Sequence, residues 1–87
     1  MITGCQLRAA RALLNLDRRS LAELSGLSLP TIQRMESAEG VVGGSVESLM
    51  KVINALESAG IKLIGADEAS ASGGRGVRLI QPDPPEQ

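Results

Sequence analysis

Apolar side chains recur every three or four positions along the first sixty residues, a spacing that predicts amphipathic helices. Four such stretches each follow a residue that favours a helix N-cap, namely Thr3, Asp17, Ser28 and Ser45. The first helix is expected over residues 4–15, and Gly26 and Gly60 are expected to end the second and the fourth. The pattern therefore predicts four helices joined by short connections.

Beyond residue 60 the pattern changes to two short apolar runs, residues 61–64 (IKLI) and 77–80 (VRLI), which are typical of β-strands. The stretch between them, residues 65–76, is rich in Ala, Ser and Gly, and we expect a flexible loop there. The chain ends in a proline-rich tail that we expect to be disordered. The expected limits are residues 1–59 for a helical domain, 60–80 for a β extension and 81–87 for the tail.

The fourth helix carries apolar residues over roughly 180° of its circumference, whereas a surface helix needs a stripe of about 100° for one core. Two short strands are also marginal by themselves and leave open edges. We therefore expect the strands to pair across a two-fold axis and to form, with the fourth helix, the interface of a homodimer. The residues assigned to this dimerisation interface are Val52, Leu56, Ile61, Leu63, Val77 and Leu79.

The residue inventory excludes several kinds of chemistry. Phe, Tyr and Trp are absent, so the chain cannot offer the aromatic platforms that stack the bases of single-stranded nucleic acid. His is absent and Cys5 is the single cysteine, which leaves no residues for a zinc site, an internal disulfide or a Cys–His nucleophile. We expect no enzymatic activity, no metal and no cofactor, and we expect Cys5 to fill a small buried space.

The net charge of −1 conceals an uneven distribution of charge along the chain. Residues 1–35 contain five arginines against Asp17 and Glu23, a balance of +3, while residues 36–87 have a balance of −4. A basic N-terminal half is typical of a surface that faces a polyanion, although a solvated basic helix face gives the same count. Because no apolar run is long enough for a membrane span or a secretion signal, we expect a cytoplasmic location.

The second and third predicted helices have the residue spacing of a helix-turn-helix. Ala22 provides the small residue that lets two short helices cross steeply, and Gly26 follows four residues later in the turn. Ile32 supplies the aliphatic anchor of the following helix six residues after that glycine. The other positions that this motif buries are Leu21, Leu27 and Met35.

At this point the sequence resembles a known family, the xenobiotic-response-element helix-turn-helix domains related to lambdoid phage repressors and Cro. The resemblance rests on residues 7–11 (LRAAR), 21–22 (LA), 26–28 (GLS) and 31–36 (TIQRME). It covers about residues 4–57, and residues 58–80 resemble a short extension found on many small members. It implies a lambda-repressor-like bundle of four to five helices that binds a duplex DNA operator as a homodimer, and a transcriptional regulator that acts as a repressor.

The resemblance also implies roles for residues at the start and on the outer face of the third helix. Ser28 and Thr31 would bond phosphate oxygens. Arg34 would reach the edge of a guanine, and Leu29 would meet a thymine methyl group. The DNA-binding residues expected on this basis are Arg18, Arg19, Ser28, Leu29, Pro30, Thr31, Gln33 and Arg34.

Four charged residues of the predicted helices are expected either to contact DNA or to form an ion pair within the chain. Arg18 and Arg19, at the start of the second helix, are expected to contact phosphate, with ordinary solvated charges as the alternative. The family match places Arg11 and Glu36 as a partly buried structural ion pair that ties the first helix to the end of the third. The charge of Arg11 is then already engaged and is not expected to contact DNA.

A second function stays open beside DNA binding. A protein-interaction module, such as an antiactivator or an antitoxin, could keep the same fold and capture a transcription factor or a toxin. The acidic second half, the apolar tip formed by Leu29 and Pro30, and the wide apolar face of the fourth helix suit that role. The controlled genes and the operator sequence cannot be derived from these residues.

Overall fold

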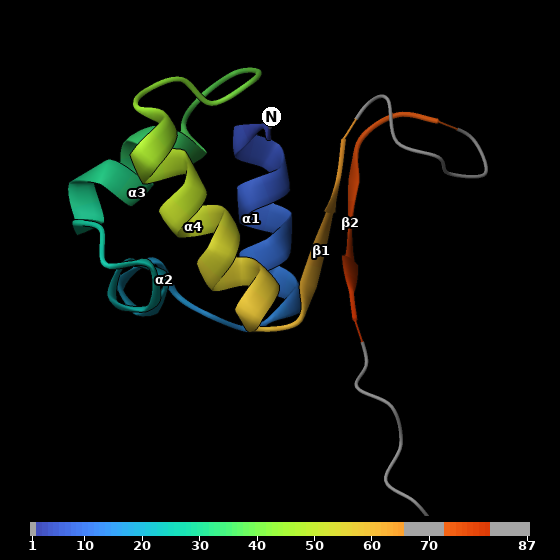
Figure 1. Ribbon diagram of the computed structural model, residues 1–87, viewed down its shortest axis with the longest axis horizontal. Helices are drawn as coiled ribbons and strands as arrows, with labels where there is room; N and C mark the ends of the chain where they lie inside the picture. The colour runs from blue at the N-terminus through green and yellow to red at the C-terminus, as the bar shows by residue number, and fades with distance from the viewer. Residues whose placement is uncertain (1, 66–72, 81–87) are drawn as a thin grey trace, which may run out of the picture.

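Four helices followed by a β-hairpin make up the computed structural model of the protein, which describes residues 2–65 and 73–80 (Figure 1). The elements in chain order are α1 (Gly4–Leu13), α2 (Arg18–Ser25), α3 (Leu29–Glu36), α4 (Val46–Ser58), β1 (Ile61–Ile64) and β2 (Gly76–Leu79). Helices α2 and α3 lie on one side of α4, and the hairpin lies at the opposite end of the molecule, beside α1. The predicted class, mainly helical with short C-terminal strands, is confirmed.

Each helix begins at the N-cap that the sequence predicts. The side chains of Thr3, Asp17, Ser28 and Ser45 each accept a hydrogen bond from the backbone N–H three residues further on. At α1 the arrangement is a capping box, because Thr3 Oγ1 accepts from Gln6 N at 3.1 Å and Gln6 Oε1 accepts from Thr3 N at 2.9 Å. These bonds fix the first residue of each helix and thus the direction of its apolar face.

Helix α1 is shorter than the predicted range of residues 4–15. Leu14 is its C-cap, and Asn15 has a left-handed backbone with a φ of 55°, so the helix does not continue through it. A hydrogen bond from Leu16 N to Arg11 O, at 3.0 Å, closes the turn. The Arg11 guanidinium in turn donates to Leu16 O at 3.1 Å, which ties this turn to the side of α1.

A single aliphatic core joins the four helices to β1. Its fully buried side chains include Leu7, Leu21, Ile32, Val52, Leu56 and Ile61. Helix α4 packs against both α2 and β1 of its own chain, and this accounts for its wide apolar arc. The wide apolar face, from which a homodimer interface was expected, is thus covered in part by β1 of the same chain, while Val46 and Met50 of α4 remain exposed.

The two strands pair with each other in an antiparallel hairpin, with Ile61 opposite Leu79 and Ile64 opposite Gly76. The strands thus pair first within the chain, and pairing across a two-fold axis, which stays a prediction, would have to use the outer edge of the hairpin. Gln6 Nε2 donates to the carbonyl oxygens of Ile64 and Gly76, both at 2.9 Å. The buried Gln6 side chain thus fastens the loop end of the hairpin to the start of α1.

Burial changes the assignment of the expected dimerisation residues. Four of the six, Val52, Leu56, Ile61 and Leu63, are buried in the core of a single chain and present little or no surface to a second one. The other two remain accessible to different degrees: Val77 is half-buried, and Leu79 is 41% exposed. The sequence pattern alone could not separate the two groups, because core and interface positions are equally apolar.

Cys5 is exposed, which corrects the expectation that it fills a buried space. Leu7 and Ala10 occupy the core face of α1, and Cys5 lies two residues before Leu7, on the other side of the helix. Most of the expected flexible loop and all of the expected disordered tail, residues 66–72 and 81–87, lie outside the described residues.

Candidate nucleic-acid interface

Helices α2 and α3 form a helix-turn-helix whose turn is closed by a glycine. Gly26 has a φ of 73°, a left-handed conformation that suits glycine, and its N–H donates to the carbonyls that end α2. Ala22 and Leu21 of α2 are buried, as is Ile32 of α3. The small residue Ala22, the turn residue Gly26 and the anchor Ile32 thus have the burial and the backbone conformation that the motif predicts.

The outer face of α3 presents polar side chains to solvent. Gln33 and Arg34 are exposed, and neither side chain has a hydrogen-bond partner within the described part of the chain. Leu29, at the start of the helix, is half-buried, whereas the neighbouring Pro30 is exposed. The two polar side chains available to reach a base edge are thus Gln33 and Arg34.

Ser28 and Thr31 lie together at the N-terminus of α3. Ser28 Oγ accepts from Thr31 N at 3.3 Å, and the two hydroxyl oxygens are 2.9 Å apart, within hydrogen-bond distance. The Ser28 hydroxyl is therefore first of all a helix cap. Ser28 is exposed and Thr31 is half-buried, so the pair is open to solvent where the helix dipole favours an anion.

The start of α2 places two arginines in different environments. Arg19 is exposed and has no hydrogen-bond partner among the described residues. Arg18 Nε lies 3.1 Å from Glu36 Oε1, an ion pair that the sequence did not predict. The preceding Asp17 accepts from Ser20, and the backbone N–H of Ser20 is the main cause that lowers the pKa of this carboxyl below 3.8.

The buried Glu36 is the centre of a charge cluster that joins α1, α2 and α3. Its side chain is 1% exposed, and Arg11 binds it twice, from Nε to Oε2 at 2.9 Å and from Nη2 to Oε1 at 3.1 Å. Arg18 supplies a third bond to the carboxylate, and Arg8 Nη1 donates to the backbone carbonyl oxygen of Glu36 at 2.6 Å. Within the described residues, no buried side-chain polar atom lacks a hydrogen-bond partner.

The family resemblance predicts the pair of Arg11 and Glu36 but gives no sign of the contacts of Arg8 and Arg18 with Glu36. Arg8 lies three residues before Arg11, on the same side of α1, and this spacing could have indicated it. The close approach of α1 to α3 depends on Gly4, where a Cβ atom would lie 2.6 Å from Ala38 O. No sequence pattern marked that glycine as a contact point.

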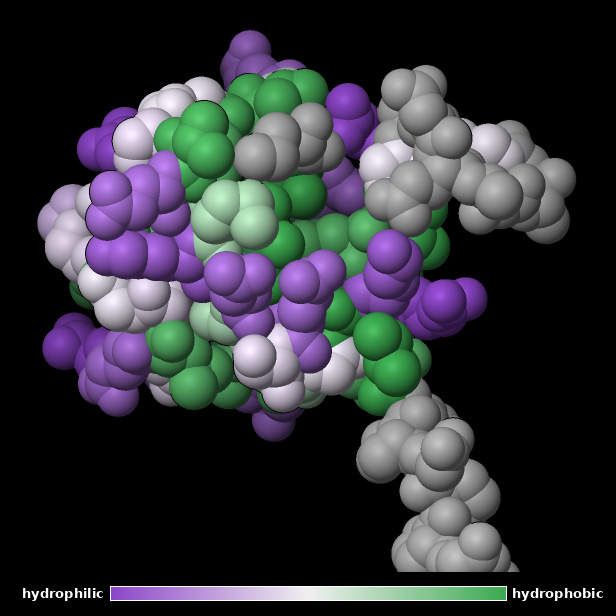
Figure 2. Space-filling view, viewed as in Figure 1, coloured by the Kyte–Doolittle hydropathy of each residue, from purple (hydrophilic) through white to green (hydrophobic). Residues whose placement is uncertain are grey.

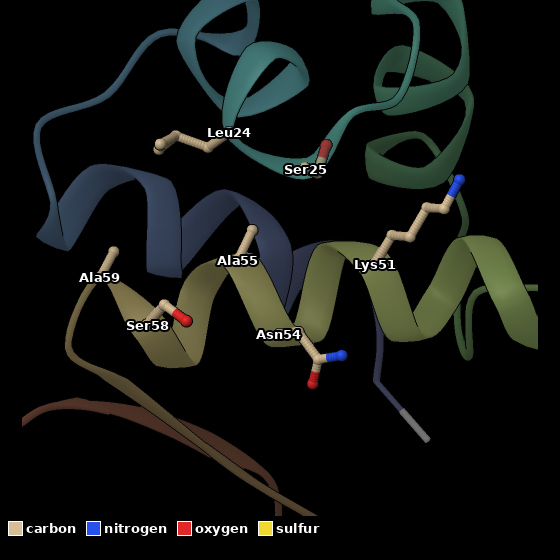
Figure 3. Close-up of a pocket in the computed structure, with 7 residues that line it drawn as sticks. All are labelled: Leu24, Ser25, Lys51, Asn54, Ala55, Ser58 and Ala59. Carbon is tan, nitrogen blue, oxygen red and sulfur yellow. The ribbon is translucent and has the colours of Figure 1, made fainter.

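Among the grooves of the described residues, two border the helix-turn-helix. One lies between α2 and α4, where Leu24, which is 56% exposed, reaches over Ala55 and Ala59 (Figure 3). The other lies next to the end of α3 and is lined by Arg34, Met35 and the glycine-rich loop before α4. Figure 2 shows that hydrophobic and hydrophilic surface alternate on the side of the molecule that carries α4.

The fold and the exposed face of α3 define a small helical bundle with a helix-turn-helix. A family profile described as helix-turn-helix matches residues 7–59, from α1 through α4, and this covers more than half of the chain. The chain therefore belongs to the helix-turn-helix family of the xenobiotic-response-element and Cro type, a family of DNA-binding transcription regulators rather than of enzymes.

Two further findings accompany the family match. None of the curated proteins compared with the chain matches it. No helix among the described residues has the length and apolar character that crossing a bilayer requires.

Proposed function

We propose that the protein is a repressor that recognises a specific duplex DNA sequence as a homodimer and acts by occupying its operator. The observation that supports this best is the outer face of α3, where Gln33 and Arg34 are exposed and unpaired within the described part of the chain. The second helix of a helix-turn-helix enters the major groove, where such side chains meet base edges. Arg34 would donate two bonds to a guanine, and Gln33 has the geometry to bind an adenine.

Phosphate contacts would hold α3 in register on the duplex. Arg18 and Arg19 lie at the start of α2, which crosses the DNA backbone in this arrangement. Ser28 and Thr31 would add hydroxyl groups at the N-terminus of α3, and the half-buried Leu29 would contact a thymine methyl group. Phosphate contacts carry little sequence information, so specificity would depend on Gln33, Arg34 and Leu29.

A homodimer would place two copies of α3 in one face of the duplex, with half-sites about 34–36 Å apart. The hairpin supplies the surface that we assign to this contact. The bond from Ile80 N to Gly60 O sets the alternation of the hairpin, so the N–H and C=O groups of Val77 and Leu79 point away from β1. An exposed strand edge with apolar side chains is a template for pairing with a second copy.

Sedimentation of the Leu79→Lys variant at tens of micromolar tests the dimer. We expect a monomer, because the substitution puts a positive charge at the edge of β2, where the two copies would pair. Val46→Lys is the matched control, since Val46 is an exposed apolar residue away from the hairpin. A wild-type monomer, or a Leu79→Lys variant that stays dimeric, would move the interface elsewhere.

Selection of a preferred duplex from random sequences, followed by titration of variants, tests the DNA-reading role. Arg34→Ala is expected to weaken binding to the selected duplex by about 1–3 kcal/mol and to relax preference at one base pair. Arg19→Ala is expected to weaken binding to all duplexes about equally and to reduce the salt slope by about one. A wild-type protein that selects no sequence would reject this function.

The groove between α2 and α4 supports a second candidate, a module that captures a protein. Leu24 overhangs small side chains there, a shape that can take an apolar side chain of a partner such as a transcription factor or a toxin. Under this hypothesis Leu24→Asp abolishes capture of the partner and leaves DNA affinity unchanged. Under the repressor hypothesis Arg34→Ala weakens regulation, whereas Leu24→Asp does not.

A further inference from the structure

The guanidinium group of Arg18 is bound on one side only. Its Nε–H donates to Glu36 Oε1 at 3.1 Å, while its two terminal Nη groups have no partner within the described part of the chain. The side chain is 46% exposed, so this free edge is accessible to a ligand. A guanidinium is planar, and a bond through Nε therefore fixes the plane in which the two Nη groups lie.

The group that holds Arg18 is itself fixed. Glu36 is 1% exposed, and two bonds from Arg11 hold both of its carboxylate oxygens. Arg8 holds its main chain through the carbonyl oxygen. The carboxylate of Glu36 is therefore held in one position, and its bond to Nε favours one orientation of the Arg18 guanidinium.

The charge balance leaves Arg18 able to bind an anion. One carboxylate faces the guanidinium groups of both Arg11 and Arg18, so it cannot neutralise both. Arg11 is the more buried of the two and takes two of the three bonds. A net positive charge therefore remains at the more exposed arginine, at the first residue of α2.

We propose that Glu36 is a positioning residue, which orients Arg18 so that its two Nη groups grip a single backbone phosphate of duplex DNA. Two parallel N–H bonds from an arginine match two oxygens of a phosphate, and they are stronger when the guanidinium is already oriented. The inference rests on the proposed binding of duplex DNA. It adds that a buried carboxylate, a group that repels phosphate by charge, strengthens the phosphate contact through geometry.

Titration of the selected duplex against Arg18→Lys at several salt concentrations tests the inference. Lysine keeps the charge, so the salt slope should stay at the wild-type value. The ammonium group cannot bind Glu36 and two phosphate oxygens in one plane, so affinity should fall about five- to tenfold. Arg18→Ala should lower affinity further and reduce the salt slope by about one.

Two other arginine-to-lysine variants provide the comparison. Arg19 is exposed at the next position and makes no hydrogen bond or salt bridge to a carboxylate among the described residues, so Arg19→Lys should lose less than half as much affinity as Arg18→Lys. Arg78→Lys on β2 shows the effect of the same exchange away from α2 and α3. Equal losses for Arg18→Lys and Arg19→Lys, or wild-type affinity for Arg18→Lys, would overturn the inference.

Glu36→Gln provides a test of opposite sign. Removal of a negative charge should tighten DNA binding by long-range electrostatics alone, whereas replacing the carboxylate that holds Arg18 by a neutral amide, a weaker acceptor, should weaken it in spite of the gain in net charge. Circular dichroism at low temperature measures the folded fraction of the Glu36→Gln variant. Where that fraction is too low for a binding measurement, the Arg18→Lys titration decides the inference. A wild-type protein that binds no duplex defeats the proposed function, while a binding wild type with a tighter Glu36→Gln variant defeats the inference only.

Discussion

Replacing Arg11 by methionine should lower the free energy of unfolding by about 3 kcal/mol, at the lower end of the range for breaking a buried ion pair. Arg11 makes three hydrogen bonds, two to the carboxylate of Glu36 and one to Leu16 O. Its loss leaves the 1% exposed carboxylate with only the single bond from Arg18. We place the cost at the lower end because that remaining bond still compensates part of the buried charge.

Replacing Arg18 by methionine should cost far less, at most about 1 kcal/mol, the usual value for an exposed ion pair. Arg18 is 46% exposed and contributes one bond, and Arg11 still satisfies both oxygens of Glu36 when Arg18 is absent. The ratio between the two losses is therefore a signature of this geometry. A diffuse electrostatic role for both arginines would give similar losses.

Urea unfolding followed by far-ultraviolet circular dichroism measures these losses, since the chain has no aromatic residue to report by fluorescence. With an m-value of about 1 kcal/mol per molar urea, a loss of 3 kcal/mol lowers the midpoint by about 3 M. A chain of this length has a total stability of only about 4–13 kcal/mol, so the shift is large.

The double variant Arg11→Met with Glu36→Leu completes the test. It replaces the buried pair by apolar side chains and removes the uncompensated charge, so much of the lost stability should return. Additive losses in the two single variants, with no recovery in the double, would refute the buried pair as the cause. An Arg11→Met loss no larger than that of Arg18→Met would refute the division of bonds described here.

Three further predictions concern the surroundings of the site. Gly4→Ala should cost about 1–3 kcal/mol in urea unfolding, because its Cβ would lie 2.6 Å from a backbone oxygen, whereas Gly43→Ala, in open space, should cost little. Gln6→Leu should cost about 2 kcal/mol and accelerate hydrogen exchange in the hairpin before that in α2, because it loses the bonds that fasten both strands to α1. Asp17 should titrate below 3.8 by NMR. Because its folded pKa is lowered, its contribution to stability is present above the unfolded pKa and is lost as the pH falls through the folded pKa, and Asp17→Asn should remove this dependence.

The helices could be predicted because their determinants are local. N-caps act over three residues, and apolar spacing repeats within each helix, so both can be read along the chain. The end of α1 was misplaced because the left-handed Asn15 and its closing bonds depend on Arg11 as well as on local propensity. Cys5 was misplaced because its small size suits a core, whereas the face on which it lies is set by the phase of α1.

The candidate site was predictable only in part, for the same reason. The residues on the outer face of α3 follow from the register of a single helix, so Gln33 and Arg34 could be singled out. The contacts of Arg8 and Arg18 with Glu36 join residues 28 and 18 positions apart, and neither arises from a spacing along one helix. Such contacts become visible only when the crossing of α1, α2 and α3 is known.

The slightly negative charge of the whole sequence does not oppose the binding of DNA. All nine basic residues lie within the described part of the chain, where six acidic residues accompany them and leave a net charge of +3. The other four acidic residues, Asp67, Glu68, Asp83 and Glu86, belong to residues 66–72 and 81–87. Affinity for a duplex depends on the charges that come within about 10 Å of the phosphates, the screening length at moderate salt, rather than on the sum over the chain. Glu36 is the acidic residue that binds Arg11 and Arg18, and it is buried. Its negative charge therefore holds these arginines in place and is not exposed to the phosphates.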